Sequence, residues 1–501
     1  MTNKNANPRI KKNKTGDVRD YIVTDISFLH HQFTNTMTSQ DESFRDTIAT
    51  VDDKGKRIWV YPKMPKGWFY DKRKLLSYIL LALLFATPHI KIGGEPMILL
   101  NVIERKFVFF GQIFWPQDFY ILAIGLVVSV VFVVLFTVIF GRIFCGWFCP
   151  QTIFMEMLFR RIEYWIDGDW THQKKLDAQP WNAEKIRKRV LKHSIFYGIS
   201  FLIANTFLAY IIGAEQLWEI QVADPRNHIG GLIALIIFTF VFYGVFMFLR
   251  EQVCTTICPY GRLQGVLLDK NSIVITYDHV RGEERGKFRK NEDRKTAGKG
   301  DCIDCGHCVD VCPTGIDIRH GTQLECVNCT ACIDACDHMM EAVDLPKGLI
   351  RYDSENGINT GVKFRWTPRV IGYTVVLTLL FGVLVTLVAT RTDFSAKMLR
   401  QRGTTYQELA DGRISNIYEL NLTNKTKNEY TVRLELIDSK GEIELALQDA
   451  VLEPEQHLKS PVIVKMNPED IKKGRNFVYV GIYAGDKLVT KVKTTFIGPI
   501  L

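Results

Sequence analysis

The twelve cysteines of this 501-residue chain all fall into spacings that are typical of metal or redox sites. Eight of them form two runs with the spacing C-x2-C-x2-C-x3-C, which are Cys302, Cys305, Cys308 and Cys312, closed by Pro313, and Cys326, Cys329, Cys332 and Cys336. Three thiolates on one short loop, with a fourth just beyond it, are the usual ligands of a [4Fe–4S] cluster. Structural zinc is the alternative, but zinc usually takes its ligands as two pairs separated by a longer spacer.

We therefore predict two [4Fe–4S] clusters in one ferredoxin-like unit. In two-cluster ferredoxins the fourth cysteine of each run binds the other cluster. By that pattern the first cluster is bound by Cys302, Cys305, Cys308 and Cys336, and the second by Cys326, Cys329, Cys332 and Cys312. Two clusters in one unit favour electron transfer over a purely structural role. A disulfide framework is disfavoured, because nothing else in the sequence indicates a small secreted domain.

The other four cysteines form two C-x3-C-P pairs, Cys145 and Cys149 before Pro150, and Cys254 and Cys258 before Pro259. If these segments are helical, the two thiols of each pair lie one turn apart on one face. Four soft donors would suit Cu(I), zinc or an iron–sulfur centre, or they could cycle between dithiol and disulfide. Inert buried thiols are the alternative. We predict that the four act together as a redox or copper site.

Five long and nearly uncharged apolar runs predict membrane-spanning helices. They are Leu75–Ile90, Phe119–Phe140, Ile195–Ile212, Leu232–Leu249 and Val370–Thr390, the first interrupted by Pro88 and His89. His89 and Asp118 lie near the outer ends of spans, where they are candidates for a proton or metal path, although charge is less costly at that depth. The first 74 residues are polar, so no cleavable signal peptide is expected.

Positive charge is concentrated on alternate loops. Residues 1–74, 141–192 and 250–368 hold fifteen, ten and sixteen Lys and Arg, whereas 91–117 hold three and 213–229 hold one. The positive-inside rule places the basic segments in the cytoplasm and residues 391–501 outside, as expected for a multi-pass membrane protein. Because this alternation accounts for the net charge of +9, no nucleic-acid partner is expected.

The chain therefore divides into five predicted parts. Residues 1–74 form a cytoplasmic tail, and 75–269 a four-span domain of duplicated hairpins that end in FGRIFCGWFCPQT (140–152) and LREQVCTTICPYGR (249–262). Such a repeat brings the two C-x3-C-P motifs together. Residues 270–368 form the cytoplasmic cluster domain, 369–390 the fifth span, and 391–501 a periplasmic β-sandwich of immunoglobulin type, since alternating runs recur through 413–499. Residues 151–166 are expected to form an amphipathic helix along the membrane surface.

Several motifs resemble the FixG/CcoG family of cytochrome c oxidase accessory proteins: PQDFY (116–120), GRIFCGWFCPQT (141–152), CPYGRLQ (258–264), both cysteine runs and the C-terminal β-domain. The resemblance implies an inner-membrane polyferredoxin that assists assembly of cbb3-type oxidase by reducing Cu(II) to Cu(I). It implies a cytosolic electron donor, copper ions, and oxidase assembly factors or subunits as partners. A quinol-linked electron relay and an assembly scaffold with incidental clusters are the alternatives. One departure is Asp337, which stands where the second run would have its closing proline.

Overall fold

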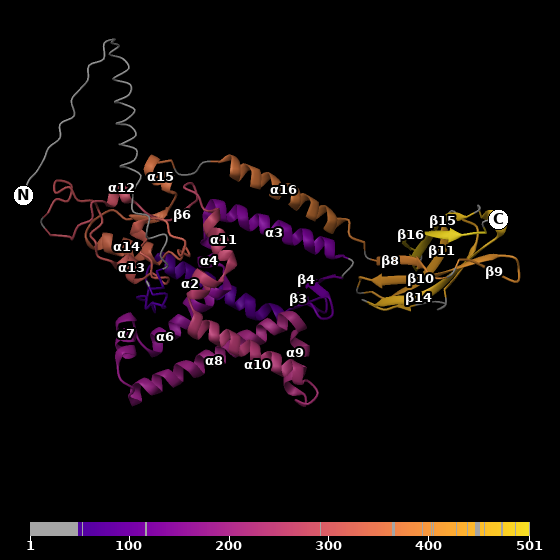
Figure 1. The fold of residues 1–501 in the computed structure, drawn as a ribbon, viewed down its shortest axis with the longest axis horizontal. Coiled ribbons are helices and arrows are strands. Elements are labelled where there is room, and N and C mark those ends of the chain that lie inside the picture. The colour runs from indigo at the N-terminus through magenta and orange to yellow at the C-terminus, as the bar shows by residue number, and fades with distance from the viewer. Residues whose placement is uncertain are drawn as a thin grey trace, which may run out of the picture.

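The computed structural model describes residues 49–499, apart from gaps at 53, 116–117, 291, 363–365, 393, 402, 404, 427, 438, 446–450, 455, 472–473 and 486. Most of the predicted N-terminal tail therefore lies outside the described residues. The molecule is elongated, with three parts along its long axis (Figure 1). The eight-cysteine domain (residues 270–362) lies at one end, a helical membrane domain in the middle, and a β-sandwich (residues 394–499) at the other end.

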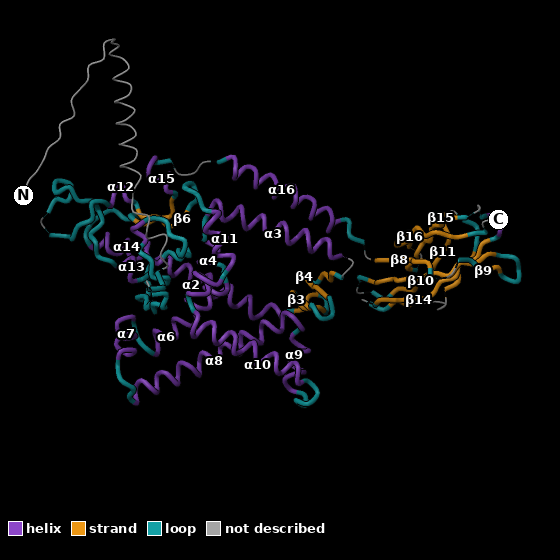
Figure 2. The backbone as a smooth tube through the Cα atoms, viewed as in Figure 1, coloured by secondary structure: helices purple, strands orange, loops and turns teal. Residues whose placement is uncertain are grey.

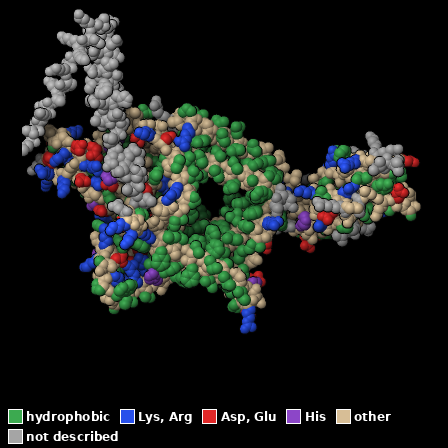
Figure 3. All heavy atoms as spheres, viewed as in Figure 1, with side chains coloured by type: hydrophobic (Ala, Val, Ile, Leu, Met, Phe, Trp, Pro, Cys, Tyr) green, Lys and Arg blue, Asp and Glu red, His purple; other side chains and the backbone are tan. Residues whose placement is uncertain are grey.

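Four helices are long and apolar enough to cross a membrane. They are α3 Phe119–Phe140, α8 Ala183–Ile212, α10 Ile229–Gly244 with its π-helical continuation η5 Val245–Leu249, and α16 Pro368–Ala389. They run between the eight-cysteine domain and the β-sandwich end (Figures 1 and 2). Hydrophobic side chains cover this middle region, whereas Lys and Arg gather around the eight-cysteine end (Figure 3). These helices fit a membrane protein and confirm four of the predicted spans.

The remaining predicted span corresponds to α2 Trp68–Ala86, which begins before the expected Leu75 and is followed by the short turn η2 Thr87–His89. The helix is long enough, but its first turns contain Asp71, Lys72, Arg73 and Lys74, so it carries more charge than the four candidate spans. The prediction of five spans is thus confirmed for four only. After α2, five short strands form two small sheets near the β-sandwich end, which the sequence did not indicate: β1 Lys91–Ile92, β2 Glu95–Pro96, β3 Ile98–Asn101, β4 Lys106–Phe109 and β5 Gln112–Phe114.

The segment after the first C-x3-C-P motif is a continuous helical stretch: α5 Pro150–Ile153, the π-helical turn η4 Phe154–Phe159 and α6 Arg160–Ile166. The prediction of an amphipathic surface helix here is wrong. Phe159 is fully buried against Phe196 and Phe246, and the guanidinium of Arg160 is buried as well. The helix is therefore part of the core, followed by α7 Trp170–Ala178; α9 Ala214–Val222 connects α8 to α10.

Helices and one small sheet build the eight-cysteine domain. Strand β6 Val274–Tyr277 pairs antiparallel with β7 Ile350–Asp353. The helices are α11 Pro259–Leu267 leading into the domain, and α12 His279–Gly282, α13 His307–Asp310, η7 Ile318–His320, α14 Ala331–Ala342 and α15 Glu355–Thr360 within it. Ile275, Ile350 and Met340 are buried between the sheet and α14.

The β-sandwich consists of two antiparallel sheets, in the order β12-β14-β10-β8, with β9 beside β10, and β13-β11-β15-β16. The strands are β8 Phe394–Arg400, β9 Gln407–Glu408, β10 Ile414–Asn424, β11 Tyr430–Ile437, β12 Glu442–Leu445, β13 Val451–Leu452, β14 His457–Met466, β15 Arg475–Ala484 and β16 Lys487–Ile497. Leu420, Val462, Val480 and Phe496 are fully buried between them. The predicted two-sheet architecture is confirmed.

Candidate metal centres

The eight cysteines of the two runs line two separate cavities. Cavity 1 is lined by Cys302, Cys305, Cys308 and Cys336, and cavity 2 by Cys312, Cys326, Cys329 and Cys332, with Cys308 also reaching its edge. The fourth cysteine of each run thus lies with the first three of the other run. Helix α14 makes this possible, because it supplies Cys332 to cavity 2 and Cys336 to cavity 1.

The two runs wrap their cavities with the same backbone. Asp304 and Asn328, each one residue before the second cysteine of its run, have φ values of 51° and 53°. Gly306 and Thr330, each one residue after it, have φ values of 71° and 68°. Left-handed conformations are costly for residues other than glycine, so their repetition at matched positions indicates a defined loop geometry.

The residues around the cavities fit iron–sulfur clusters. Both cavities have four cysteine sulfurs and otherwise mainly apolar walls, such as Ile275 and Val327 at cavity 2. Burial raises the pKa of the Cys308 and Cys326 thiols, each to about 12. Thiolates at such positions need a compensating positive charge, which an iron–sulfur core supplies. Asp337 has its own role in place of the missing proline, because its carboxylate accepts a 2.8 Å hydrogen bond from the Gly348 N–H.

The two C-x3-C-P motifs also share one backbone conformation. Gly141 (φ 58°, ψ −138°) and Arg250 (φ 53°, ψ −124°) stand at matched positions four residues before the first cysteine. The N–H of Cys149 bonds to the Phe144 carbonyl at 2.9 Å, and that of Cys258 to the Val253 carbonyl at 2.7 Å. These matching interruptions of the helices, at the same position in each motif, support the predicted duplication.

The motifs are not single straight helices, however. Cys145 lies in α4 Ile143–Trp147 and Cys254 in the π-helical turn η6 Val253–Ile257. Cys149 and Cys258 are extended, with ψ of 122° and 111°, and each precedes the proline that begins the next helix. The two thiols of a pair are therefore not one turn apart on a single helix, as expected. The first cysteine lies in a helical turn, and the second directly precedes the next helix, whose first position is proline, a residue favoured there.

The first thiol of each pair lies beside cavity 2. Cys145 is buried in one apolar cluster with Val327 and Cys329, and Cys254 packs against this cluster. The Cys145 thiol donates to Gln264 Oε1 at 2.8 Å, and Gln264 Nε2 donates to Thr137 Oγ1 at 3.1 Å.

The thiols of the two pairs lie near one another, but they do not surround a common metal-binding centre. Burial raises the pKa of Cys145, Arg142 opposes this, and Cys149 and Cys258 raise it further, so both pairs influence one thiol. Among the residues that the structure describes, no three His, Cys, Asp or Glu side chains are placed to hold one metal ion.

Glycine permits the close approach of the first C-x3-C-P loop to the second cysteine run. A Cβ atom at Gly146 would lie 2.5 Å from the Val327 carbonyl oxygen and 2.8 Å from that of Asn328. The Nε of Arg73, from α2, donates to the Gly146 carbonyl at 2.7 Å, and Trp147 Nε1 donates to the Tyr352 hydroxyl at 3.2 Å. The membrane domain and the eight-cysteine domain are thus joined at cavity 2.

Comparison with known proteins decides the family. The chain is 34% identical to the nitrogen fixation protein FixG of Rhizobium meliloti, over 76% of this chain and 79% of that protein. It is 35% identical to protein RdxA of Cereibacter sphaeroides, over 77% and 83%, and 32% identical to RdxB of the same organism, over 82% and 87%. The chain belongs to the FixG/CcoG-like family.

Family models place iron–sulfur chemistry on this FixG-family chain. A "4Fe-4S dicluster domain" matches residues 249–355 and a "4Fe-4S binding domain" matches 122–173. Residues 384–499 match the "IG-like fold at C-terminal of FixG". The two 4Fe–4S domains make this chain an iron–sulfur protein of electron transfer, as the cysteine spacing predicts. Both C-x3-C-P pairs lie inside the regions so matched.

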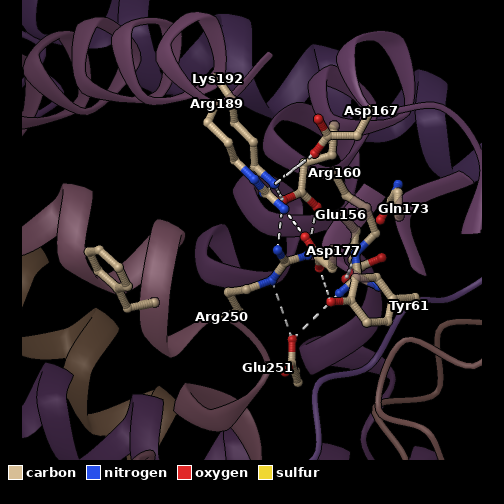
Figure 4. Close-up of polar contacts among 12 residues, drawn as sticks. Tyr61, Glu156, Arg160, Asp167, Gln173, Asp177, Arg189, Lys192, Arg250 and Glu251 are labelled. Carbon is tan, nitrogen blue, oxygen red and sulfur yellow. Dashed lines mark hydrogen bonds and ion pairs between the residues drawn. The ribbon is translucent and has the colours of Figure 1, made fainter. Parts of the chain in front are cut away.

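Sequence reasoning missed a buried charge network that supports the second C-x3-C-P motif (Figure 4). Both oxygens of Glu163 accept from Arg250 at 2.6 Å, and Lys192 is 2.7 Å from Glu163 and 3.0 Å from Asp167. Glu251, the next residue after Arg250, lies 3.6 Å from Arg160. All these side chains are almost fully buried. The charges at 156, 160, 163 and 167, spaced three or four apart on one helix, are the signal that could have indicated it.

The minor candidates take other roles. Asp118, a candidate for a proton or metal path, instead forms ion pairs with Arg391 at 2.9 Å and Lys425 at 2.5 Å. His307, within the first cysteine run, and His338, two residues after the second, line a cleft of about 910 Å³ between the eight-cysteine domain and the start of α2.

Proposed function

We propose that this FixG-family chain assists assembly of cbb3-type cytochrome c oxidase by reducing Cu(II) to Cu(I). In the proposal Cys302, Cys305, Cys308 and Cys336 hold one [4Fe–4S] cluster, and Cys326, Cys329, Cys332 and Cys312 hold the other. A cytosolic donor supplies electrons, and Cys145, Cys149, Cys254 and Cys258 receive copper. The observation that carries it is the shared buried contact of Cys145, Cys254 and the cavity 2 residue Cys329.

The chemistry of the donors supports this order of sites. Bound iron–sulfur clusters supply one-electron carriers whose potentials depend on burial and hydrogen bonding. Soft thiolates favour Cu(I), whereas Cu(II) prefers nitrogen and oxygen donors in a tetragonal arrangement. A thiol site therefore holds the reduced ion better than the oxidised one. Cys145 is buried and bonded to Gln264, whereas Cys149, Cys254 and Cys258 are only partly buried and would be the thiols that an incoming ion meets.

The proposed topology has five spans in a bacterial inner membrane. Helix α2 begins at the eight-cysteine domain, where Asp334 caps it, and η2 behind it reaches the small sheet at the β-sandwich end. Helix α2 therefore extends between the same two ends of the molecule as the four apolar helices. Five spans and the positive-inside rule put the eight-cysteine domain in the cytoplasm and the β-sandwich in the periplasm. Reporter fusions after Arg391 and within residues 280–300 test this; cytoplasmic activity of the first would contradict it.

Copper titration of the anaerobically purified holoprotein tests the function. Cys145→Ser and Cys254→Ser should each weaken Cu(I) binding about tenfold or more, and the double variant should add little, because residues of one site are not additive. Iron and acid-labile sulfide content must stay at wild-type values. Additive losses would refute a shared site, and unchanged copper stoichiometry in the double variant would refute copper binding there. Oxidation of the reduced protein by a quinone, with none by Cu(II), would instead favour a quinol-linked relay.

The scaffold alternative is tested in cells. If the clusters are incidental, Cys302→Ser should still support oxidase assembly. On the present proposal it should abolish assembly while leaving the amount of protein in the membrane unchanged.

A further inference from the structure

Residues 281–290 and 292–300, here called the basic loop, are hydrogen-bonded to the backbone of a cavity 1 cysteine. The buried Arg294 donates to the carbonyls of Gly286 at 3.1 Å, Gly300 at 2.8 Å and Cys302 at 3.0 Å. The Cys302 N–H donates to the Gly282 carbonyl at 3.3 Å, and its carbonyl accepts from the Gly286 N–H at 3.2 Å. The loop is therefore fixed to the backbone of Cys302, which lines cavity 1.

The outer face of the basic loop carries positive charge that the chain does not neutralise. Three of its basic residues are paired: Arg281 with Asp301 at 2.8 Å, Arg285 with Glu283 at 3.1 Å and Lys299 with Glu292 at 2.5 Å. Four others are exposed and have no ion pair within the described part of the chain: Lys287, Arg289, Lys290 and Lys295. The exposed Glu284 and Asp293 offset part of this charge, but the loop keeps a positive excess. Such an excess steers a partner of the opposite sign.

Cavity 1 is also where the redox centre meets solvent. Of the twelve cysteines, only Cys305 is exposed, and it lines cavity 1. Cavity 2 is instead covered by the first C-x3-C-P loop of the membrane domain, at Gly146. Electron transfer weakens steeply with distance, so a soluble donor must dock close to Cys305. The two cavities thus differ in access: cavity 1 faces an incoming carrier and cavity 2 faces the C-x3-C-P thiols.

The position of the basic loop favours a soluble partner over a lipid surface. The loop lies at the end of the molecule that is furthest from the β-sandwich, beyond the ends of the apolar helices (Figures 1 and 2). Lys and Arg side chains are visible on this end in Figure 3. In the proposed topology the lipid headgroups would lie at the ends of the apolar helices, on the other side of the eight-cysteine domain from the loop.

We propose that the basic loop is the docking surface for a small, acidic one-electron carrier protein, which delivers its electron at Cys305. The carrier is oxidised by one electron and the redox centre of cavity 1 is reduced by one, with no bond made or broken. A cluster held by four thiolates is negatively charged and would repel such a carrier, and the loop offsets that repulsion. This inference rests on the proposed function in treating cavity 1 as a cluster site.

Binding of a purified acidic [2Fe–2S] ferredoxin to the full-length holoprotein tests the proposal, measured by calorimetry at low and at high salt. Lys287→Glu/Lys290→Glu should weaken binding about tenfold or more and flatten its salt dependence. The matched control is Lys174→Glu/Lys175→Glu, the same charge change on the exposed face of α7, which should bind like wild type. Full bleaching of the iron–sulfur absorbance by dithionite shows that both variants keep their clusters.

Two results would overturn the inference. One is equal affinity of the loop variant and wild type, or an equal loss in the control, which would indicate unspecific attraction. The other is loss of binding to phosphatidylglycerol vesicles with carrier binding unchanged, which would make the loop a membrane contact. Normal carrier binding together with absent Cu(II) reduction would contradict the proposed function alone.

Discussion

At the residue scale, Arg250 holds a backbone conformation that favours glycine, and its matched position in the first motif is Gly141. Such a conformation costs about 1–3 kcal/mol in a residue with a side chain and persists only where the surroundings impose it. Here the bidentate ion pair with Glu163 imposes it. At Gly141 a side chain is excluded instead, because a Cβ atom would lie 2.5 Å from Val274. The same interruption of the helix before each C-x3-C-P motif is thus stabilised in two ways, by an ion pair at Arg250 and by the absence of a side chain at Gly141.

Glu163 should therefore control stability and its acid dependence. Burial alone would raise the pKa of Glu163, but Arg250 and Lys192 outweigh burial and lower it from 4.5 to about 2. The folded pKa lies below the unfolded one, so the stabilisation is complete above pH 4.5 and is lost as the pH falls from 4.5 toward 2. Glu163→Gln should cost about 3–5 kcal/mol at neutral pH, since the buried Arg250 loses its bidentate partner and the buried Lys192 keeps only Asp167.

Thermal unfolding in detergent across this pH range measures the effect. At neutral pH the Glu163→Gln variant should unfold at a lower temperature than wild type. Its unfolding temperature should also fall less between pH 4.5 and 2. Glu184→Gln is the control, because its pair with Lys188 is exposed, and it should unfold like wild type. An equal acid dependence in Glu163→Gln and wild type would show that other carboxylates govern it.

At the element scale, α14 links the two cavities to the membrane domain. It carries Cys332 and Cys336, and between them Asp334, whose carboxylate accepts from the N–H groups of Phe69 at 3.1 Å and Tyr70 at 2.7 Å. Asp334 thus caps α2 from a distant part of the sequence. This contact connects α2 directly to the helix that serves both cavities.

Loss of this cap should loosen the junction. Asp334→Ala should destabilise the protein by about 0.5–2 kcal/mol, the usual cost of a lost N-cap, and speed the release of iron on heating. Asp334→Asn keeps an acceptor oxygen and should lie close to wild type. Glu341→Ala, on the exposed side of the same helix, is the matched control. Iron release followed by absorbance would contradict the argument if the Ala and Asn variants behaved alike.

Helices and strands with a local sequence pattern were predicted well, whereas features that depend on distant residues were not. Apolar runs located α3, α10 and α16 closely, and alternation located β10, β11 and β14–β16, because those signals are local. The start of α2 was missed because its cap comes from Asp334. The helix at 151–166 was predicted to lie at the surface because Glu251, a buried partner of Arg160, lies far along the chain. Cysteine spacing indicated the ligands, but the approach of Gly146 to Val327, which joins the thiol pairs to cavity 2, depends on tertiary packing.

At the scale of the whole molecule, the cysteines and the β-sandwich lie at opposite ends of the spans (Figure 1). The β-sandwich follows α16 directly, and a second attachment holds it to the membrane domain. Asp118, at the start of α3, is buried between Arg391 at the end of α16 and Lys425 in the loop after β10. A carboxylate that neutralises two cations from the β-sandwich side fixes the orientation of that domain to the spans.

Removal of this carboxylate should free the β-sandwich. Asp118→Ala leaves two buried cations without a partner, at a cost of about 3–5 kcal/mol if the interface stays closed, so the domain should open instead. Distances between spin labels on unnatural amino acids at Val102 and Glu408, both exposed, should broaden in the variant. Glu419→Gln, which removes an exposed pair with Lys459, should leave the distribution narrow. A narrow distribution in Asp118→Ala would show that α16 alone sets the orientation, and the iron content should be the same in every variant because cavities 1 and 2 lie at the other end.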